Sequence, residues 1–175
     1  MAVYTRINDG DLSLIEKTFK IGKILSFSGI KKGIENTNYI IRTKNKKIIL
    51  TIFEKRVQKK DLPFFMDLMF GLSRQKIKCP EPIKNKKGKY LFKIKNKTAC
   101  LVSFLEGKDK INLTNKDCYV VGKNAALLHM AAKKLRIYRK NSLSVNSWGP
   151  LLNRIDKRIN KLSDNLINIM KNDLS

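Results

Sequence analysis

The segment most suggestive of chemistry lies between Ser28 and Tyr39, where glycines accompany small polar side chains. Glycine lets the backbone approach a phosphate group closely, and free amide N–H groups or short polar side chains donate hydrogen bonds to its oxygens. The segment lacks the complete G-x-G-x-x-G pattern of protein kinases, so a polar hairpin loop and a phosphate-binding loop both explain it. The candidate phosphate-binding residues are Gly29, Gly33, Asn36, Thr37 and Asn38.

A phosphate-binding loop of this kind works with a cation on a following strand, where protein kinases place a lysine. Here the centre of the third expected strand carries Thr51, and the nearest lysine on the same face is Lys55, four residues later. Lys55 is therefore a candidate phosphate ligand, although a solvated surface lysine explains it too. Asp67 on the next expected helix could orient Lys55, but its pattern favours a solvent-exposed polar residue.

The segment Ser103–Leu105 ends an expected strand just before a polar stretch, so its backbone could pair with an adenine ring. The single histidine, His129, lies beside leucines on an expected helix, and we interpret it as structural. The cysteines include no C-x-x-C pair, and their odd number argues against both a disulfide scaffold and a zinc site. They are Cys79, Cys100 and Cys118.

The hydrophobic pattern around these residues predicts a small sheet and two short helices. A helix N-capped by Asp11 comes first, and a helix N-capped by Asp61, with Pro63 in its first turn, follows the third strand. This order indicates an antiparallel sheet with one covering helix, an arrangement analogous to a kinase-type nucleotide-binding lobe. The expected strands cover residues 24–27, 38–43, 47–54, 89–94 and 98–104.

Helices dominate the rest of the chain. Residues 106–110 (EGKDK) are polar and form the best internal boundary. Thr114 is expected to N-cap a helix that reaches Lys134, with Asp117 completing a capping box. After a loop, Pro150 is expected to begin an amphipathic helix whose apolar positions run to Ile169.

The composition bounds the class of protein. The chain has 175 residues, 42% of them hydrophobic, so it can bury a core and is not a disordered basic tail. It contains no apolar run long enough to span a membrane and no secretory signal pattern at its start. We therefore expect a soluble, cytoplasmic protein without a membrane partner.

The net charge of +24 makes nucleic acid a partner to consider. However, 30 of the 38 basic residues are lysine, whereas proteins that read bases and phosphates favour arginine. Lysine, isoleucine and asparagine are over-used together, and their codons are rich in A and T. Nucleic-acid binding therefore stays an alternative, and codon bias explains much of the charge.

Four sequence segments, together with two later ones, resemble a known family. MAVYTRI, GIKKGIENTNYIIRT, IILTIFEKRVQKKDLPFFMDLM and CLVSFLEG, with the later VGKNAALLHMA and NSLSVNSWGPLL, resemble the N-terminal half of bacterial homoserine kinases of the aminoglycoside-phosphotransferase-like family. The similarity runs from Met1 to about Leu152 with its spacing intact. It departs from the family pattern at Ala126, where leucine is usual.

The resemblance implies an α+β, protein-kinase-like fold that phosphorylates the hydroxyl of L-homoserine with ATP and Mg²⁺. It implies an N-terminal ATP-binding lobe over 1–104, a hinge over 105–110 and the start of a helical substrate lobe over 111–175. Asn36, Thr37 and Asn38 would lie at the phosphates and Ser103 to Leu105 at the adenine, and the family tolerates threonine at position 51. With the pattern-based candidates, the expected nucleotide-binding residues are Gly33, Asn36, Thr37, Asn38, Thr51, Lys55, Ser103, Phe104 and Leu105.

One departure from the family is large. Its catalytic loop, H-G/A-D-x-x-x-x-N, and its metal-binding D-F-Y segment do not occur in these 175 residues. The catalytic base and the Mg²⁺ ligands are therefore expected beyond Ser175, and the chain by itself is expected to be inactive. Another small-molecule kinase of the same fold, acting on choline or an amino alcohol, and a non-catalytic scaffold stay open as alternatives.

Overall fold

The computed structural model describes residues 3–55, 57–141, 144–152, 168–169 and 172. The chain divides into two compact units, Met1–Ile137 and Tyr138–Ser175. In the described part, no helix is both long and apolar enough to cross a lipid bilayer. The expected division into a lobe over 1–104, a hinge and a second lobe from 111 stays a prediction.

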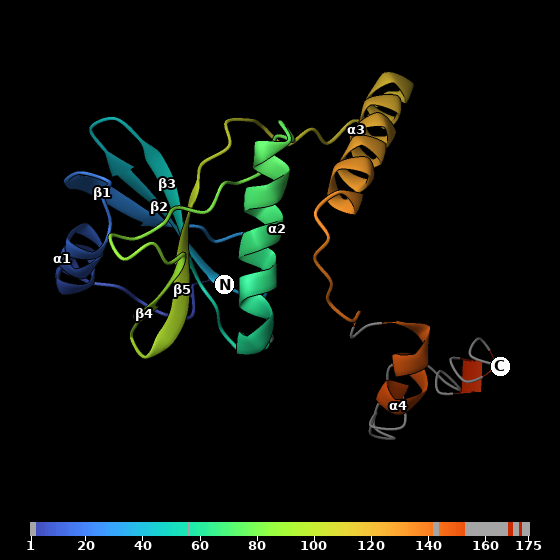
Figure 1. Ribbon diagram of the computed structural model, residues 1–175, viewed down its shortest axis with the longest axis horizontal. Coiled ribbons are helices and arrows are strands. Elements are labelled where there is room, and N and C mark those ends of the chain that lie inside the picture. Colours follow the sequence, from blue (N-terminus) through green and yellow to red (C-terminus); the bar gives the residue numbers. More distant parts are fainter. Residues whose placement is uncertain (1–2, 56, 142–143, 153–167, 170–171, 173–175) are drawn as a thin grey trace. The chain divides into compact units, whose positions relative to one another are not determined.

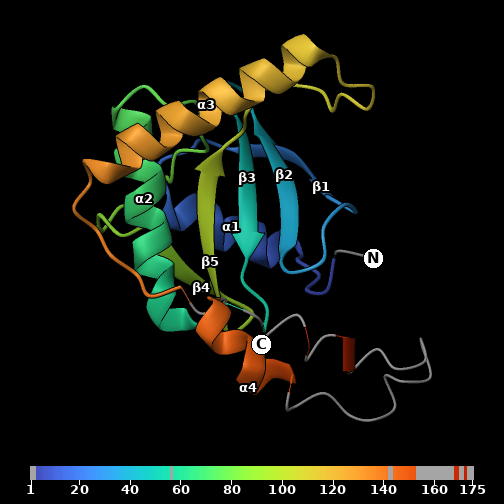
Figure 2. The ribbon, with the colours of Figure 1, turned by 90° about the vertical axis from the view of Figure 1, so that its right-hand side faces the viewer.

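The first unit contains a five-stranded antiparallel sheet, as predicted, with the strand order β1-β2-β3-β5-β4. Figure 2 shows β3 between β2 and β5. The strands are β1 (Ile24–Gly29), β2 (Thr37–Thr43), β3 (Lys47–Ile52), β4 (Leu91–Ile94) and β5 (Lys97–Ser103).

Two helices cover opposite faces of this sheet, α1 (Asp9–Thr18) on one and α2 (Leu62–Arg74) on the other (Figure 1). On the α1 face Ile15 packs into the larger core cluster with Leu50 and Leu101, and on the α2 face Met66 packs against the sheet. Because β3 is covered on both sides, its sequence is almost continuously apolar instead of alternating. The sequence predicted one covering helix; the short α1 is the second.

The beginning of α1 differs from the prediction. The N-cap is Asn8, whose side chain accepts a hydrogen bond from the Asp11 amide. Asp11 is the third helical residue, and its carboxylate accepts a hydrogen bond from the Asn8 amide at 2.9 Å. Asp11 was therefore wrongly predicted as the N-cap, because a carboxylate can serve either position of a capping box.

Three later predictions are confirmed at α2 and α3. Asp61 is the N-cap residue of α2, which has Pro63 in its first turn, although no side-chain cap bond forms. α3 (Asn115–Lys133) begins after Thr114 with both halves of the capping box to Asp117. The end of α3 contacts the end of α2, where the side-chain carboxamide of Gln75 donates to the Ala131 carbonyl at 2.9 Å.

Gly71 allows the chain after α3 to approach α2. A Cβ atom at Gly71 would lie 2.6 Å from Cδ2 of Leu135, so a larger side chain would displace that leucine. The large apolar side chains of α3 are exposed, including Val121 at 63%. In the second unit α4 (Trp148–Leu152) begins two residues before Pro150, and the rest of the helix predicted to Ile169 falls largely outside the described residues.

Candidate functional site

A cavity of about 480 Å³ lies against the α2 face of the sheet. We call it the sheet–α2 cavity. Its walls come from the central strands, from apolar side chains of α2 and from the chain that follows β5. The lining residues are Ile30, Asn38, Ile49, Thr51, Phe53, Phe65, Met66, Met69, Pro80, Cys100, Val102, Ser103, Phe104 and Leu105.

Asn38, Thr51 and Cys100 form a row across the cavity wall. Asn38 pairs with Thr51 between β2 and β3, and Thr51 pairs with Cys100 between β3 and β5. The Thr51 hydroxyl donates to the Asn38 carboxamide oxygen at 2.8 Å, which fixes the orientation of the amide group. The row carries no formal charge, and the Asn38 NH₂ group can donate to an oxygen atom in the cavity.

Ser103, Phe104 and Leu105 form one rim of the cavity. The Ser103 amide donates to the Glu81 carbonyl at 2.9 Å, and the Phe104 amide donates to the Lys47 carbonyl at 3.4 Å. In the part of the chain that is described, no acceptor is recorded for the Leu105 amide. The rim thus offers a backbone donor beside an apolar cavity, which suits a flat heterocycle with a ring nitrogen acceptor.

Ile30, the first residue of the loop between β1 and β2, also lines the cavity. Gly33 has a φ of 122°, a backbone conformation that favours glycine. The Lys32 ammonium lies 2.6 Å from the Asp109 carboxylate, and both side chains are exposed. Their hydrogen bond and charge attraction raise the pKa of Lys32 and lower the pKa of Asp109.

Four of the nine expected nucleotide-binding residues, and the loop candidate Gly29, do not line this cavity. The Thr37 side chain is fully buried, and its hydroxyl hydrogen-bonds to the amides of Tyr4 and Thr5 and to Glu54. The Asn36 carboxamide accepts a hydrogen bond from the Glu54 amide at 3.4 Å. Gly33 and Lys55 are exposed. The cavity therefore brings together Asn38, Thr51, Ser103, Phe104 and Leu105 among the predicted residues.

Sequence reasoning missed the apolar lining of the cavity. Phe65, Met66 and Met69 come from α2, and Cys100 comes from the middle of β5. The signal was present, since residues 64–69 carry the apolar stripe of that helix. An apolar stripe, however, predicts only that a helix face is covered, and it does not separate a packed core from a cavity wall.

Cys100 should be chemically inert despite lining the cavity. Burial raises the pKa of its thiol to about 12, and the side chain is only 1% exposed. Because the thiolate is the reactive form, iodoacetamide at pH 8 is expected to label the exposed Cys118 and to leave Cys100 unmodified until the protein unfolds. Peptide mass spectrometry of native and urea-treated protein measures this. Rapid native labelling at Cys100, with Cys118→Ser as background, would contradict the burial.

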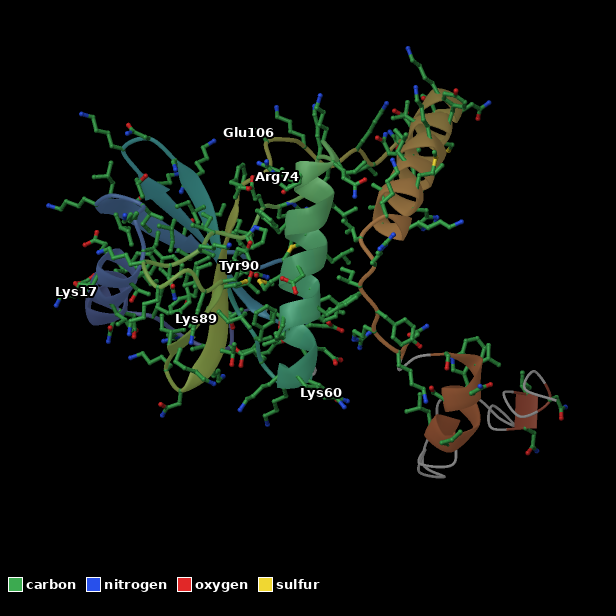
Figure 3. The ribbon with its side chains drawn as sticks, in the orientation of Figure 1. Lys17, Lys60, Arg74, Lys89, Tyr90 and Glu106 are labelled. Atoms are coloured by element: carbon green, nitrogen blue, oxygen red, sulfur yellow. The ribbon has the colours of Figure 1, made fainter. Side chains whose placement is uncertain are left out.

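Three lysines of the first unit lie on different elements. Lys17 lies on α1, Lys60 just before α2 and Lys89 just before β4, and Figure 3 shows them on separate parts of the surface. Tyr90 lies between the sheet and α2, where it packs against the smaller core cluster. These three lysines therefore share no common stripe of the kind that nucleic-acid-binding proteins present.

Comparison with known proteins gives the same fold. A model described as "Phosphotransferase enzyme family" matches residues 26–167. A spectinomycin phosphotransferase solved with ADP and spectinomycin has a TM-score of 0.59 at 16% identity, covering 97% of this chain and 54% of that one. A second structure, its AMP-bound complex, has a TM-score of 0.54 at 16% identity, covering 93% and 52%. These likenesses confirm the predicted aminoglycoside-phosphotransferase-like fold.

Curated relatives are more similar in sequence. A homoserine kinase of Parvibaculum lavamentivorans is 42% identical over 151 residues, which are 86% of this chain and 47% of that protein. Homoserine kinases of Methylobacterium radiotolerans and Agrobacterium fabrum are 37% and 38% identical, covering 100% and 95% of this chain and 54% and 52% of theirs. The chain thus spans about half the length of the curated relatives it matches.

Proposed function

The chain belongs to the phosphotransferase enzyme family, and on this premise we propose that it is the nucleotide-binding part of a homoserine kinase. The observation that carries the proposal is the identity of 37–42% to curated homoserine kinases over 86–100% of the chain. The segments that resemble homoserine kinases also include residues of the cavity wall and rim, among them Asn38, Thr51 and Ser103. A choline or amino-alcohol kinase is the alternative, and comparing homoserine with choline as substrates distinguishes the two.

The proposed reaction moves the γ-phosphoryl group of ATP to L-homoserine. The substrate hydroxyl oxygen bonds to the γ-phosphorus, the bond from that phosphorus to the β–γ bridging oxygen breaks, and the hydroxyl proton passes to a general base. The products are O-phospho-L-homoserine and ADP. Positioning and electrostatic stabilisation supply most of the rate enhancement in such transfers.

In this proposal the sheet–α2 cavity holds the nucleotide. The adenine lies between the apolar side chains of β5 and α2 and accepts a hydrogen bond from the Leu105 amide. The Asn38 NH₂ group, oriented by Thr51, donates to a phosphate oxygen. Gly33 lets the loop backbone approach the phosphates, and Lys55, an exposed residue three positions after the end of β3, is the proposed cation.

Mg²⁺ supplies charge neutralisation at the transferring phosphate when it is bound. The described residues contain no group of three or more His, Cys, Asp or Glu side chains that could hold a metal ion. We propose that the Mg²⁺ ligands and the general base belong to the part of the homoserine kinases that this chain does not span.

The test is phosphoryl transfer by the intact protein. With ATP and Mg²⁺, L-homoserine is expected to give O-phospho-L-homoserine, detected by ³¹P NMR, whereas choline and spectinomycin are expected to give no product. The 175-residue chain alone should show no turnover above background. Phosphorylation of choline but not homoserine would overturn the substrate assignment, and turnover by the isolated chain would show that it contains its own base.

A further inference from the structure

The N-terminal segment, residues 3–7, contacts the loop between β1 and β2 from the side opposite the cavity. The amides of Tyr4 and Thr5 both donate to the Thr37 hydroxyl oxygen, at 2.9 and 3.1 Å. The Tyr4 hydroxyl donates to the Ile34 carbonyl at 3.1 Å, within the loop itself. The Tyr39 hydroxyl donates to the Thr5 carbonyl at 2.9 Å. The segment thus contacts the loop at Ile34 and the beginning of β2 at Thr37 and Tyr39.

Glu54 joins these contacts into one network. One of its carboxylate oxygens accepts hydrogen bonds from the hydroxyls of Thr5 and Thr37, each at 2.7 Å. The other oxygen pairs with the Lys97 ammonium, which also donates to the Thr5 hydroxyl at 2.7 Å. The Glu54 amide donates to the Asn36 carboxamide at 3.4 Å. β2, β5 and the N-terminal segment therefore meet at a single carboxylate just after β3.

The charge of this carboxylate is held in place by its partners. The Glu54 side chain is only 10% exposed, and such burial by itself raises the pKa of a carboxyl group. Hydrogen bonds from Lys97, Thr5 and Thr37 more than offset this, so the pKa of Glu54 lies below its usual value. Glu54 is therefore ionised at neutral pH, and removing one partner leaves another buried polar group unsatisfied.

The network and the cavity share one stretch of backbone. Thr37 and Asn38 are adjacent in β2, so their side chains point to opposite faces of the sheet. Thr37 is fixed by the network on the α1 face, and Asn38 lines the cavity on the α2 face. The hydrogen bonds that fix Thr37 therefore also fix the position of Asn38 and of the C-terminal end of the β1–β2 loop.

We propose that the N-terminal segment, locked by the Glu54–Lys97 ion pair, is a positioning element that orders the β1–β2 loop for binding a nucleoside triphosphate. This inference rests on the proposed function, in which the cavity holds ATP. Glu54, Lys97 and Thr5 act through the loop and touch no substrate. Without the ion pair the fold is expected to stay intact. The free energy needed to order the loop is then subtracted from the binding free energy of the nucleotide, so the affinity falls.

The test compares two matched carboxylates in the intact protein. Glu54→Gln breaks the lock, whereas Asp11→Asn breaks an equally buried pair, since Asp11 is 11% exposed and bonds to Lys95 at 3.2 Å. Glu54→Gln is expected to raise the Kd for ADP and the KM for ATP about fivefold, with the KM for homoserine unchanged. Both variants are expected to lower the melting temperature by similar amounts. Asp11→Asn is expected to leave the ADP Kd unchanged.

Rescue separates the lock from a general loss of stability. Lys97→Arg should retain ADP affinity and Lys97→Met should lose it, both measured by calorimetry alongside thermal unfolding. Equal ADP affinity in wild type and Glu54→Gln, or equal weakening by Asp11→Asn, would overturn the proposal, as would a wild type that binds no nucleotide. A wild type that binds ADP but does not phosphorylate homoserine would refute the proposed substrate alone and leave the lock standing if Glu54→Gln weakens ADP binding.

Discussion

Replacing Leu105 with proline is expected to weaken ADP binding by the intact protein by about tenfold or more. Proline has no amide hydrogen, so the donor that faces the cavity rim is lost and the base nitrogen acceptor is left unpaired. The loss should fall on binding, because the described structure records no intramolecular acceptor for that amide. Isothermal calorimetry with ADP measures the change.

Leu105→Ala is the matched control for this substitution. It removes a side chain that is 47% exposed but keeps the amide, so it should change the Kd for ADP by less than about threefold. Thermal unfolding of both variants checks that the sheet is intact. If Leu105→Pro binds ADP as tightly as Leu105→Ala does, the backbone of this rim is not where the base binds.

Replacing Leu101 with alanine is expected to lower the free energy of unfolding by about 3 kcal/mol. Leu101 is fully buried in the middle of β5, where it pairs with Leu50 and belongs to the core on the α1 face. Its backbone also holds the chain beside β5, because the Ile83 amide donates to the Leu101 carbonyl at 2.8 Å. Alanine would leave a cavity that the covered sheet cannot collapse to fill.

Urea denaturation of the intact protein measures this loss. Ile111→Ala is the control, since that side chain is 92% exposed and should change the unfolding free energy by less than about 0.5 kcal/mol. A Leu101→Ala variant as stable as the control would mean that the sheet face beneath α1 is loosely packed. A loss with a changed urea dependence would indicate a second unfolding step in addition to the cavity.

The two predictions address neighbouring residues with different tasks. Leu101 points to the α1 face, which carries the larger core cluster, and Leu105 lies on the cavity rim four residues later. Between them Val102 belongs to the smaller cluster under α2. The end of β5 therefore connects the packing of the sheet to the proposed base-binding rim, and the two measurements separate stability from binding.

Much of the fold followed from the sequence because its signals are local. The apolar run at residues 47–54 predicted β3, and Thr114 with Asp117 predicted the start of α3, where both hydrogen bonds of the capping box form. Local signals were ambiguous where two residues could play the same part. Asn8 and Asp11 both suit the beginning of α1, and the choice depends on which backbone amides are free.

Part of the candidate site was likewise predicted by local sequence signals, and part depended on the tertiary structure. Glycine and small polar residues at 29–38, and the position of segment 103–105 at the end of an expected strand, indicated where a nucleotide could bind. Strand alternation also implied that Thr37 and Asn38 point to opposite faces. Which face holds the cavity was decided by the positions of α1 and α2, since both faces of this sheet are covered and the sequence of a doubly covered strand does not distinguish them.

Only the tertiary structure assigned partners to the charges. From the sequence Glu54 was one residue in the run KIILTIFE, and Lys97 was one of 30 lysines, 43 positions away. Their ion pair depends on β3 and β5 being neighbours in the sheet, and Thr5 of the N-terminal segment adds a hydrogen bond to the same carboxylate. The sequence determined which residue types were available; the strand order determined that Glu54 contacts Thr37 at the start of β2, because contacts across a sheet are set by register and not by distance along the chain.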